Sequence, residues 1–397
     1  STEAKAAFGN GDLYIEKFVT SLRHIEAQLI RDNFGNSKVI GIRDCSVQRN
    51  NQKIMEESGS VLLPKELNKA VRNYAEKIGD SVDYVGVGTV EFIHDVPNNA
   101  IYFMEMNTRL QVEHPVTEAV TGVNIVEKQF EISEGKSIAK MKSSEKGYAL
   151  EVRVNAEKLV TDALGKISFQ PTPGEVTKCF LPEEKNIRTI SMISEGKFVP
   201  PFYDSLVIQI ISYGRNRKDS IDKMSAYLEK VVINGICTNV PLLRRILKDE
   251  IFIQGRYDTS YLDDLLERID FDEMSAEIEE ASGGRGIDFD IETLKIAGSN
   301  ELRVLCPSAG IFYRAPSPSE PEYVNEGDII STEDVLCQLE AMKMFTPMNL
   351  NSFSGDGSSI YGESTKYEIT RINMANGQQV NEGDLLFVIR KYLDEEE

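Results

Sequence analysis

The chain has 397 residues, of which 41% are hydrophobic and 27% are charged. These proportions are ordinary for a soluble globular protein, and the length allows two to four domains. With 44 Lys and Arg against 64 Asp and Glu, the formal charge is −20. Such an acidic surface gains no counterion release from a polyanion, so nucleic acid and anionic membrane are not expected partners. No apolar run approaches the roughly 20 residues of a membrane helix, and STEAKAAFGNGD lacks the basic and apolar regions of a signal peptide.

Cysteine and histidine are scarce in this chain. The five cysteines are scattered and form no CxxC pair, which favours a reducing cytoplasm over a disulfide framework or a zinc cage. Because only three histidines are present, any bound metal is expected to be a hard ion held by carboxylates.

The first part of the chain mixes strand and helix patterns. Residues 13–43 predict a strand, a turn at DNFGN (32–36) and a second strand. Residues 64–80 carry apolar positions at helical spacing behind Pro64, which suits a first helical turn. VGVGTVEFIHD and AIYFMEMN predict two strands joined by PNN, and PVTEAVTGVNIVEKQFEISEG predicts a helix. This order predicts an α+β fold.

The middle of the chain changes character twice. Residues 147–215 predict short strands with Pro-Gly punctuation, and residues 218–250 predict helix, strand and helix, with the strand in VVINGICTNV. Residues 266–300 are acidic and loosely patterned, which predicts a linker containing one helix. SGGRG (282–286) looks like a phosphate-binding glycine loop. It lies outside any strand–helix context and no Lys-Ser/Thr follows, so we interpret it as part of the linker.

The C-terminal region contains an internal repeat. VNEGD occurs at 324–328 and again at 380–384, each time followed by apolar strands. Two copies of one turn-and-strand unit predict a small all-β sandwich with pseudo-two-fold symmetry. Lys343 lies between the copies, in EAMKM (340–344), where the tip of a hairpin would expose it.

EAMKM at the centre of such a sandwich resembles the biotin-attachment site of biotinyl carrier domains. The resemblance implies biotin joined by an amide to Lys343, with the flexible thioethers of Met342 and Met344 packed beside it. Lipoyl domains have the same shape but typically show Asp-Lys-Ala, so the two methionines favour biotin. CPSAGIFYRAPSPSEPEYV (306–324) looks like the protruding thumb loop of acetyl-CoA-carboxylase carriers, and a Pro-rich surface loop is the alternative.

A second group of residues carries carboxylates on neighbouring strands. Glu105 and Asn107 lie two apart on one predicted strand and therefore point to one face, where Glu91 from the paired strand can join them. Three oxygen ligands without histidine suit Mg²⁺ or Mn²⁺ bound to nucleotide phosphates. The alternative is that these side chains simply face solvent.

MNTRLQVEHPVTE (106–118), together with RHIEAQL, RDCSVQRNNQK and EVRVNAE in the same order, resembles biotin carboxylase over nearly all of residues 1–265. The resemblance implies the ATP-grasp portion at 1–146 and the biotin carboxylase C-terminal domain at 147–265. The linker at 266–300 and a biotinyl carrier domain at 301–391 would follow.

The resemblance also implies roles for individual residues, with ATP, magnesium and bicarbonate as ligands. The adenine pocket would be lined by Glu16, Lys17 and Val19, with His24 near the nucleotide. The magnesium ligands would be Glu91, Glu105 and Asn107. Bicarbonate and the carboxyphosphate intermediate would be bound by Lys53, Arg109, Gln111 and Val112. Glu113 would deprotonate bicarbonate as the general base, and Arg153 would steady the biotin enolate.

The sequence departs from this family at several places. Asn50-Asn51 stands where Arg-His is usual, and Gln209 stands where a lysine is common. SFSGDGSSIYGEST (352–365) is expected to be an inserted, exposed loop. The family's N-terminal α/β domain and glycine-rich lid would lie before residue 1, so residues 1–397 alone are expected to carboxylate biotin little.

These motifs predict a fused biotin carboxylase and biotin carrier component of an acyl-CoA carboxylase, most like acetyl-CoA carboxylase. About 35 residues separate YLDDLLERI from LRVLCPSAG, too few for the extra domain of propionyl- and methylcrotonyl-CoA carboxylases. The resemblance implies a separate carboxyltransferase subunit, a biotin protein ligase and a homodimer through the carboxylase region. The alternative is a non-catalytic biotin carrier and docking subunit with a relic carboxylase region.

Overall fold

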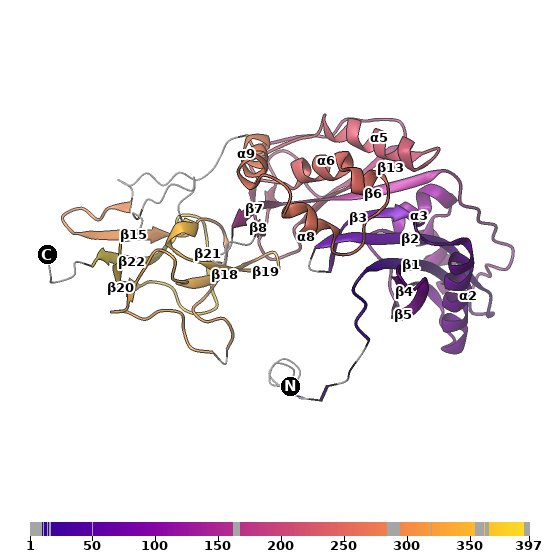
Figure 1. Ribbon diagram of the computed structural model, residues 1–397, viewed down its shortest axis with the longest axis horizontal. Coiled ribbons are helices and arrows are strands. Elements are labelled where there is room, and N and C mark those ends of the chain that lie inside the picture. The colour runs from indigo at the N-terminus through magenta and orange to yellow at the C-terminus, as the bar shows by residue number, and fades with distance from the viewer. Residues whose placement is uncertain are drawn as a thin grey trace.

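The computed structural model describes residues 10, 12, 13, 15, 17–49, 51–161, 167–283, 294–318, 320–353, 361 and 365–392. The chain forms two parts (Figure 1). The main domain, residues 17–283, is built on a large sheet with helices packed on it. The C-terminal sandwich, residues 294–392, contains two smaller sheets.

The large sheet of the main domain has eight strands, each antiparallel to its neighbours. Their order is β11 (Ile187–Ser191), β13 (Leu206–Gly214), β6 (Tyr148–Asn155), β3 (Gln52–Ser58), β2 (Ser37–Arg49), β1 (Leu22–Arg31), β4 (Gly86–Asp95) and β5 (Ala100–Asn107). The hairpins expected around DNFGN and PNN are confirmed as β1–β2 and β4–β5. The pairing of β3 with β6 carries the sheet across residue 146, so residues on both sides of that position share one sheet.

Register places polar side chains in a row across this sheet. Arg43 on β2 is opposite Glu26 on β1, Glu26 is opposite Glu91 on β4, and Glu91 is opposite Glu105 on β5. Directly opposed residues in antiparallel strands project from the same face. One face of the sheet therefore collects charges from four strands.

Helices pack against this sheet along much of its width. α2 (Lys65–Ser81), α3 (His114–Thr121) and α4 (Ile125–Ser133) contact β1, β2 and β4, whereas α5 (Arg217–Leu228) and α6 (Val240–Lys248) pack on β6 and β13. The helix expected at 64–80 is confirmed as α2, which begins directly after Pro64. The order helix, strand, helix expected at 218–250 is confirmed as α5, β14 (Val232–Asn234) and α6.

The single helix expected over PVTEAVTGVNIVEKQFEISEG is wrong, because α3 ends at Gly122. Gly122 has φ 69°, a left-handed conformation that ends a helix and that glycine adopts without a Cβ clash. Asn124 then caps α4 by accepting a hydrogen bond from the backbone N–H of Glu127 at 3.0 Å.

Short elements complete the main domain. The strands are β7 (Glu157–Thr161), β8 (Ile167–Pro171), β9 (Gly174–Glu175), β10 (Lys178–Phe180) and β12 (Phe198–Val199), and the helices are α7 (Glu250–Ile253), α8 (Tyr261–Leu266) and α9 (Phe271–Ala281). α9 is the helix expected within the acidic segment 266–300. Its Met274 and Ile278 are buried in the main core, so this part of the segment is packed onto the domain. Of SGGRG, only Ser282 and Gly283 fall within the described residues.

The C-terminal region confirms the expected sandwich. One sheet has the order β15 (Glu301–Leu305), β22 (Leu385–Lys391), β20 (Tyr367–Ile372) and β17 (Ile329–Ile330). The other has the order β19 (Met344–Met348), β18 (Cys337–Ala341), β16 (Gly310–Tyr313) and β21 (Gln378–Val380). A 3₁₀ turn, η1 (Leu350–Phe353), follows β19. Most of the inserted segment 352–365 lies outside the described residues.

The two VNEGD copies form the same turn. In the first, the Asp328 carboxylate accepts from the Asn325 backbone N–H at 2.7 Å, and in the second Asp384 accepts from Asn381 at 2.7 Å. The glycines at equivalent positions, Gly327 and Gly383, have φ values of 93° and 82°. The repeat is therefore structural. Among the described residues, no helix is long and apolar enough to cross a membrane.

Candidate active site

The three residues predicted to bind a metal lie together, with Glu91 in the middle of β4 and Glu105 and Asn107 at the end of β5. The Asn107 side-chain amide donates to Glu91 Oε1 at 2.9 Å and to Glu105 Oε1 at 3.2 Å. Glu91 is buried and Glu105 is exposed, so the group spans the edge between protein and solvent. These oxygen atoms form the hard donor set that a magnesium ion requires.

Positive charge surrounds the buried member of this group. Gln111 Nε2 donates to Glu91 Oε1 at 2.7 Å, and His24 Nε2 lies 2.9 Å from Glu91 Oε2. Burial by itself raises the pKa of Glu91, but the hydrogen bond and charge of His24, with Lys53, lower it to about 2. Burial likewise opposes protonation of His24, while Glu91 and Glu26 raise its pKa above the ordinary value. Glu91 is therefore ionised and able to attract a cation.

Beside this group, two fully buried charges organise the centre of the sheet. The Arg43 guanidinium donates to Glu26 at 2.9 Å, and its other nitrogens reach Gln28, Thr89, Gln111 and Thr117. Glu26 also accepts from the Lys53 ammonium. Burial raises the pKa of Glu26, but Lys53 and Arg43 more than offset this and lower it to about 2. Such a pair is rigid because each charge loses its compensation if the other moves.

Glu113, the predicted general base, is held between two cations. Lys53 Nζ donates to Glu113 Oε1 at 2.5 Å, and Arg153 Nη2 donates to Glu113 Oε2 at 3.0 Å. Arg153 is fixed in turn by Glu56, to which its Nε donates at 2.6 Å. Burial raises the pKa of Glu56 to about 7, although Arg153 opposes the rise. Each carboxylate oxygen of Glu113 thus accepts a hydrogen bond from a different basic side chain.

Two adjoining pockets surround these residues. The larger, of about 570 Å³, is lined by the predicted metal ligands together with His24, Lys53, Arg109 and Gln111. The smaller, of about 210 Å³, is lined by Glu113, Arg153, Val112 and again by Lys53, Arg109 and Gln111. The shared residues separate a carboxylate-rich compartment from one containing the base. Arg109 is exposed at this boundary, and its Nη1 donates only weakly, at 3.3 Å, to the Leu110 carbonyl.

Two of the residues predicted for the nucleotide pocket, Lys17 and Val19, do not join these compartments. Glu16 lies outside the described residues. Lys17 donates to Tyr102 Oη at 2.9 Å and lies 3.4 Å from Asp95, at the far end of β4 from the metal group. Val19 is half-buried and lines neither pocket. Of the predicted nucleotide residues, His24 alone lies among the described site residues.

Lys343 occupies the exposed tip of the β18–β19 hairpin, as expected. Ala341 pairs with Met344, which leaves Met342 and Lys343 as the two turn residues. Their φ values are 50° and 63°, the left-handed pair of a type I′ turn. This turn matches the right-handed twist of the strands, and it projects the lysine away from the sandwich core.

The structure adds residues that sequence reasoning missed. Glu26, Arg43 and Glu56 hold the predicted catalytic side chains, and Asn155 and Asp204 line the smaller pocket. One signal was present in RHIEAQL, where polar residues recur at every second position of a strand whose intervening residues are apolar. Gln209, which replaces the usual lysine, donates to Glu151 at 2.7 Å and to the Val112 carbonyl at 2.9 Å.

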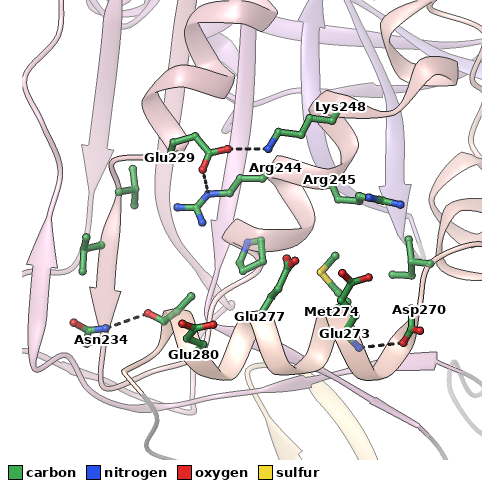
Figure 2. A pocket seen from close by; sticks show the side chains of 15 residues that line it. Glu229, Asn234, Arg244, Arg245, Lys248, Asp270, Glu273, Met274, Glu277 and Glu280 are labelled. Carbon is green, nitrogen blue, oxygen red and sulfur yellow. Dashed lines mark hydrogen bonds and ion pairs between the residues drawn. The ribbon is translucent and has the colours of Figure 1, made fainter.

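A separate pocket of about 630 Å³ lies away from these residues, between α6, α9 and β14 (Figure 2). Its α6 wall carries Arg244, Arg245 and Lys248, and its α9 wall carries Glu273 and Glu277. It contains none of the residues predicted for catalysis, so its size does not make it the active site.

Comparison with known families agrees with this geometry. Residues 1–141 match the family described as "Carbamoyl-phosphate synthase L chain, ATP binding domain", and residues 151–264 match "Biotin carboxylase C-terminal domain". Residues 303–355, which include Lys343, match "Biotin-requiring enzyme". The main domain therefore carries the ATP-grasp and C-terminal regions of a biotin carboxylase, and the C-terminal sandwich carries a biotinyl domain.

Individual biotin carboxylases and carboxylase subunits resemble the chain over the main domain. "Biotin carboxylase 1" of Bacillus subtilis is 41% identical over 263 residues, which are 66% of this chain and 57% of the relative. The "2-oxoglutarate carboxylase small subunit" of Hydrogenobacter thermophilus is 39% identical over 264 residues, 66% of this chain and 54% of the relative. The chain thus spans little more than half the length of these relatives.

Solved biotin carboxylase structures share the fold. A Campylobacter jejuni biotin carboxylase in a β,γ-ATP complex has a TM-score of 0.61 at 38% identity, covering 66% of this chain and 57% of that one. The biotin carboxylase domain dimer of the Hydrogenobacter thermophilus 2-oxoglutarate carboxylase, solved with MgADP, ADP and bicarbonate, has a TM-score of 0.61 at 39% identity. It also covers 66% of this chain and 57% of that one.

Proposed function

We propose that the protein carrying this chain uses ATP and bicarbonate to carboxylate biotin attached to Lys343. The observation that carries the proposal is the placement of Glu113 between Lys53 and Arg153, at 2.5 and 3.0 Å. A carboxylate held by two cations in a small pocket can accept the proton of a bicarbonate ion that those cations also bind. Bound biotin supplies the nitrogen that receives the carboxyl group.

In this proposal the larger pocket binds magnesium and ATP, and the smaller pocket binds bicarbonate beside the base. Glu91, Glu105 and Asn107 would hold magnesium. The ion would neutralise the phosphates of ATP while the terminal phosphoryl group is transferred to bicarbonate. Lys53 faces both compartments, because it contacts Glu113 at 2.5 Å and lies 3.5 Å from Glu91. Its ammonium group could therefore neutralise negative charge both on the phosphates of ATP and on the bicarbonate that attacks them. Arg109, exposed and weakly bonded, is free to turn towards an anion.

Biotin fits the residues present around Lys343. The side chain is exposed, and the two residues at the turn are held in a conformation that fixes its direction. A ligating enzyme can therefore reach the amine without unfolding the sandwich. A biotin protein ligase is accordingly a proposed partner.

We further propose acetyl-CoA as the final acceptor, through a separate carboxyltransferase subunit. The short segment between the main domain and the sandwich supports this choice, since it has no room for a further domain. A homodimer through the main domain is proposed by analogy with the dimeric Hydrogenobacter thermophilus domain. The five cysteines are free thiols, which supports a cytoplasmic location.

The test is a bicarbonate-dependent ATPase assay of the native polypeptide, with and without free biotin. Turnover that rises with biotin and needs bicarbonate supports the proposal. The second candidate, a carrier and docking subunit without catalysis, is favoured by Asn51 and Gln209, neither of which carries charge. That candidate predicts normal biotin attachment to Lys343 and no bicarbonate-dependent turnover. Incubation with acetyl-, propionyl- and methylcrotonyl-CoA and the partner transferase then tests the acceptor.

A further inference from the structure

The tip of the biotinyl hairpin is in contact with the main domain. The Met342 backbone N–H donates to the Pro201 carbonyl at 2.5 Å. The Met342 side chain is 1% exposed and belongs to the hydrophobic core of the main domain, whereas the sandwich has a separate core of its own. β19 lies against β8, as the two parts meet in Figure 1.

The second methionine of the tip meets Arg49. Met344 Sδ lies 3.5 Å from Arg49 Nη2, and the same nitrogen donates to Glu157 and Gln52, each at 3.1 Å. The Arg49 guanidinium stacks on Phe169 of β8 at 3.9 Å from the ring centre. Arg49 is 4% exposed, and its Nη1 has no hydrogen-bond partner within the described part of the chain. A buried, immobilised arginine thus lies where the hairpin tip contacts the main domain, and one of its N–H donors has no partner among the described residues.

These contacts anchor the tip on chain segments that continue into the lining of the smaller active-site pocket. Arg49 is the last residue of β2, and Asn51 and Gln52, which follow it in the chain, line the pocket with Glu113. Pro201 lies three residues before Asp204, which also lines this pocket. Lys343 stands between the two anchored methionines and is itself exposed. The two methionines thus hold the tip on the main domain and leave the attachment lysine exposed.

We propose that Arg49, Phe169 and Pro201 form a docking seat for the hairpin tip and that the two thioethers are what the seat recognises. This inference rests on the proposed function and names its intramolecular partner. Met342 fills an apolar site, and Met344 offers a polarisable sulfur to a stacked guanidinium. A tip with Asp and Ala beside its lysine would bury a carboxylate in the apolar site and would offer no sulfur to Arg49. The seat thus selects the biotinyl tip over a lipoyl tip.

The seat is tested by hydrogen exchange in the native, biotinylated protein, which needs no turnover. In Arg49→Ala, exchange at the Met342 amide and in residues 167–171 should accelerate by about 10-fold or more, because the docked state loses an anchor. Arg49→Lys keeps the charge but not the planar stacking, so its exchange rates should lie between those of the wild type and those of Arg49→Ala. Unchanged exchange in Arg49→Ala would overturn the proposal.

A second variant guards against misfolding of the main domain. Met342→Glu changes a side chain that lies outside the sandwich core, so the sandwich should fold while the tip undocks. Exchange in residues 167–171 should rise as in Arg49→Ala. A sandwich that stays docked with glutamate at this place would refute recognition of the thioether.

Carboxylation rates with linked and with free biotin distinguish a docking role of Arg49 from a catalytic one. Arg49→Ala should reduce carboxylation of the Lys343-linked biotin by about 10-fold, while the rate with free biotin stays unchanged, because free biotin needs no docking. Equal loss of both rates would contradict a docking role. If wild type carboxylates neither form but exchange depends on Arg49, the seat stands and the proposed function fails.

Discussion

Glu113 and Lys53 form an ion pair at 2.5 Å, although they come from the start of α3 and from β3. Lys53 also contacts Glu26 and lies within 3.5 Å of Glu91. One ammonium group therefore contacts the predicted base and lies close to Glu91, one of the predicted metal ligands. This single cation links the two compartments in which the two halves of the reaction are proposed to occur.

Glu113→Gln is expected to abolish bicarbonate-dependent turnover while nucleotide still binds. The amide has nearly the same shape but cannot accept the bicarbonate proton, and loss of a general base costs about 10²–10⁴-fold in rate. Isothermal titration with ATP and magnesium, beside the ATPase assay, separates the two effects. Full turnover in this variant would remove Glu113 from the proposed role.

Glu105→Gln should abolish ATP turnover and leave both the fold and Lys343 biotinylation intact. Glu105 is exposed, so its change removes one magnesium charge without disturbing the core. Glu127→Gln, at an exposed site on α4, is the matched control and should turn over normally. Equal turnover in the two variants would show that Glu105 merely faces solvent.

Lys343 is expected to be the only biotinylated residue. Lys343→Arg keeps a positive charge on the same turn but offers no amine that can form the amide, so streptavidin blotting should be blank. Peptide mass spectrometry of the wild-type protein provides the independent check. Biotin found on another lysine would contradict the assignment.

The stability of the protein should fall with rising pH through the titration of Glu56. Burial raises its pKa from the ordinary value of 4.5 to about 7, so the folded chain binds this proton more tightly than the unfolded chain. The contribution is complete below pH 4.5 and is lost as the pH rises through 7. The loss amounts to about 3 kcal/mol, since one pKa unit corresponds to about 1.4 kcal/mol.

Glu56→Gln provides the measurement, because glutamine keeps the size and the oxygen near Arg153 but does not titrate. Urea unfolding of both proteins between pH 4.5 and 8 should show the wild type losing stability relative to the variant. Glu127→Gln should track the wild type at every pH. A constant difference between wild type and Glu56→Gln would mean that Glu56 titrates normally.

Much of the architecture follows from local pattern. Alternation along YFMEMN placed Glu105 and Asn107 on one face, and the VNEGD repeat predicted two equivalent turns around an exposed Lys343. The break between α3 and α4 also has a local cause, Gly122. A single glycine within a periodic pattern is, however, a weak signal for the end of a helix. Short-range geometry is predictable because it depends on the backbone period and on a few residues with restricted or unusual φ.

Local sequence patterns could not predict which side chains meet in the candidate active site. Glu56 and Arg153, or Lys53 and Glu113, meet because β3 pairs with β6 and α3 packs beside them, and they lie far apart in sequence. Glu26 and Arg43 look like ordinary charges until register places them opposite each other at full burial. The burial of Met342 in a core other than its own sandwich is likewise a property of docking. The sequence by itself determined which side chains were available and which way each strand presents them. Tertiary structure decided which charges are removed from water together, because strand register and the contact between the two parts are set by packing over the whole molecule.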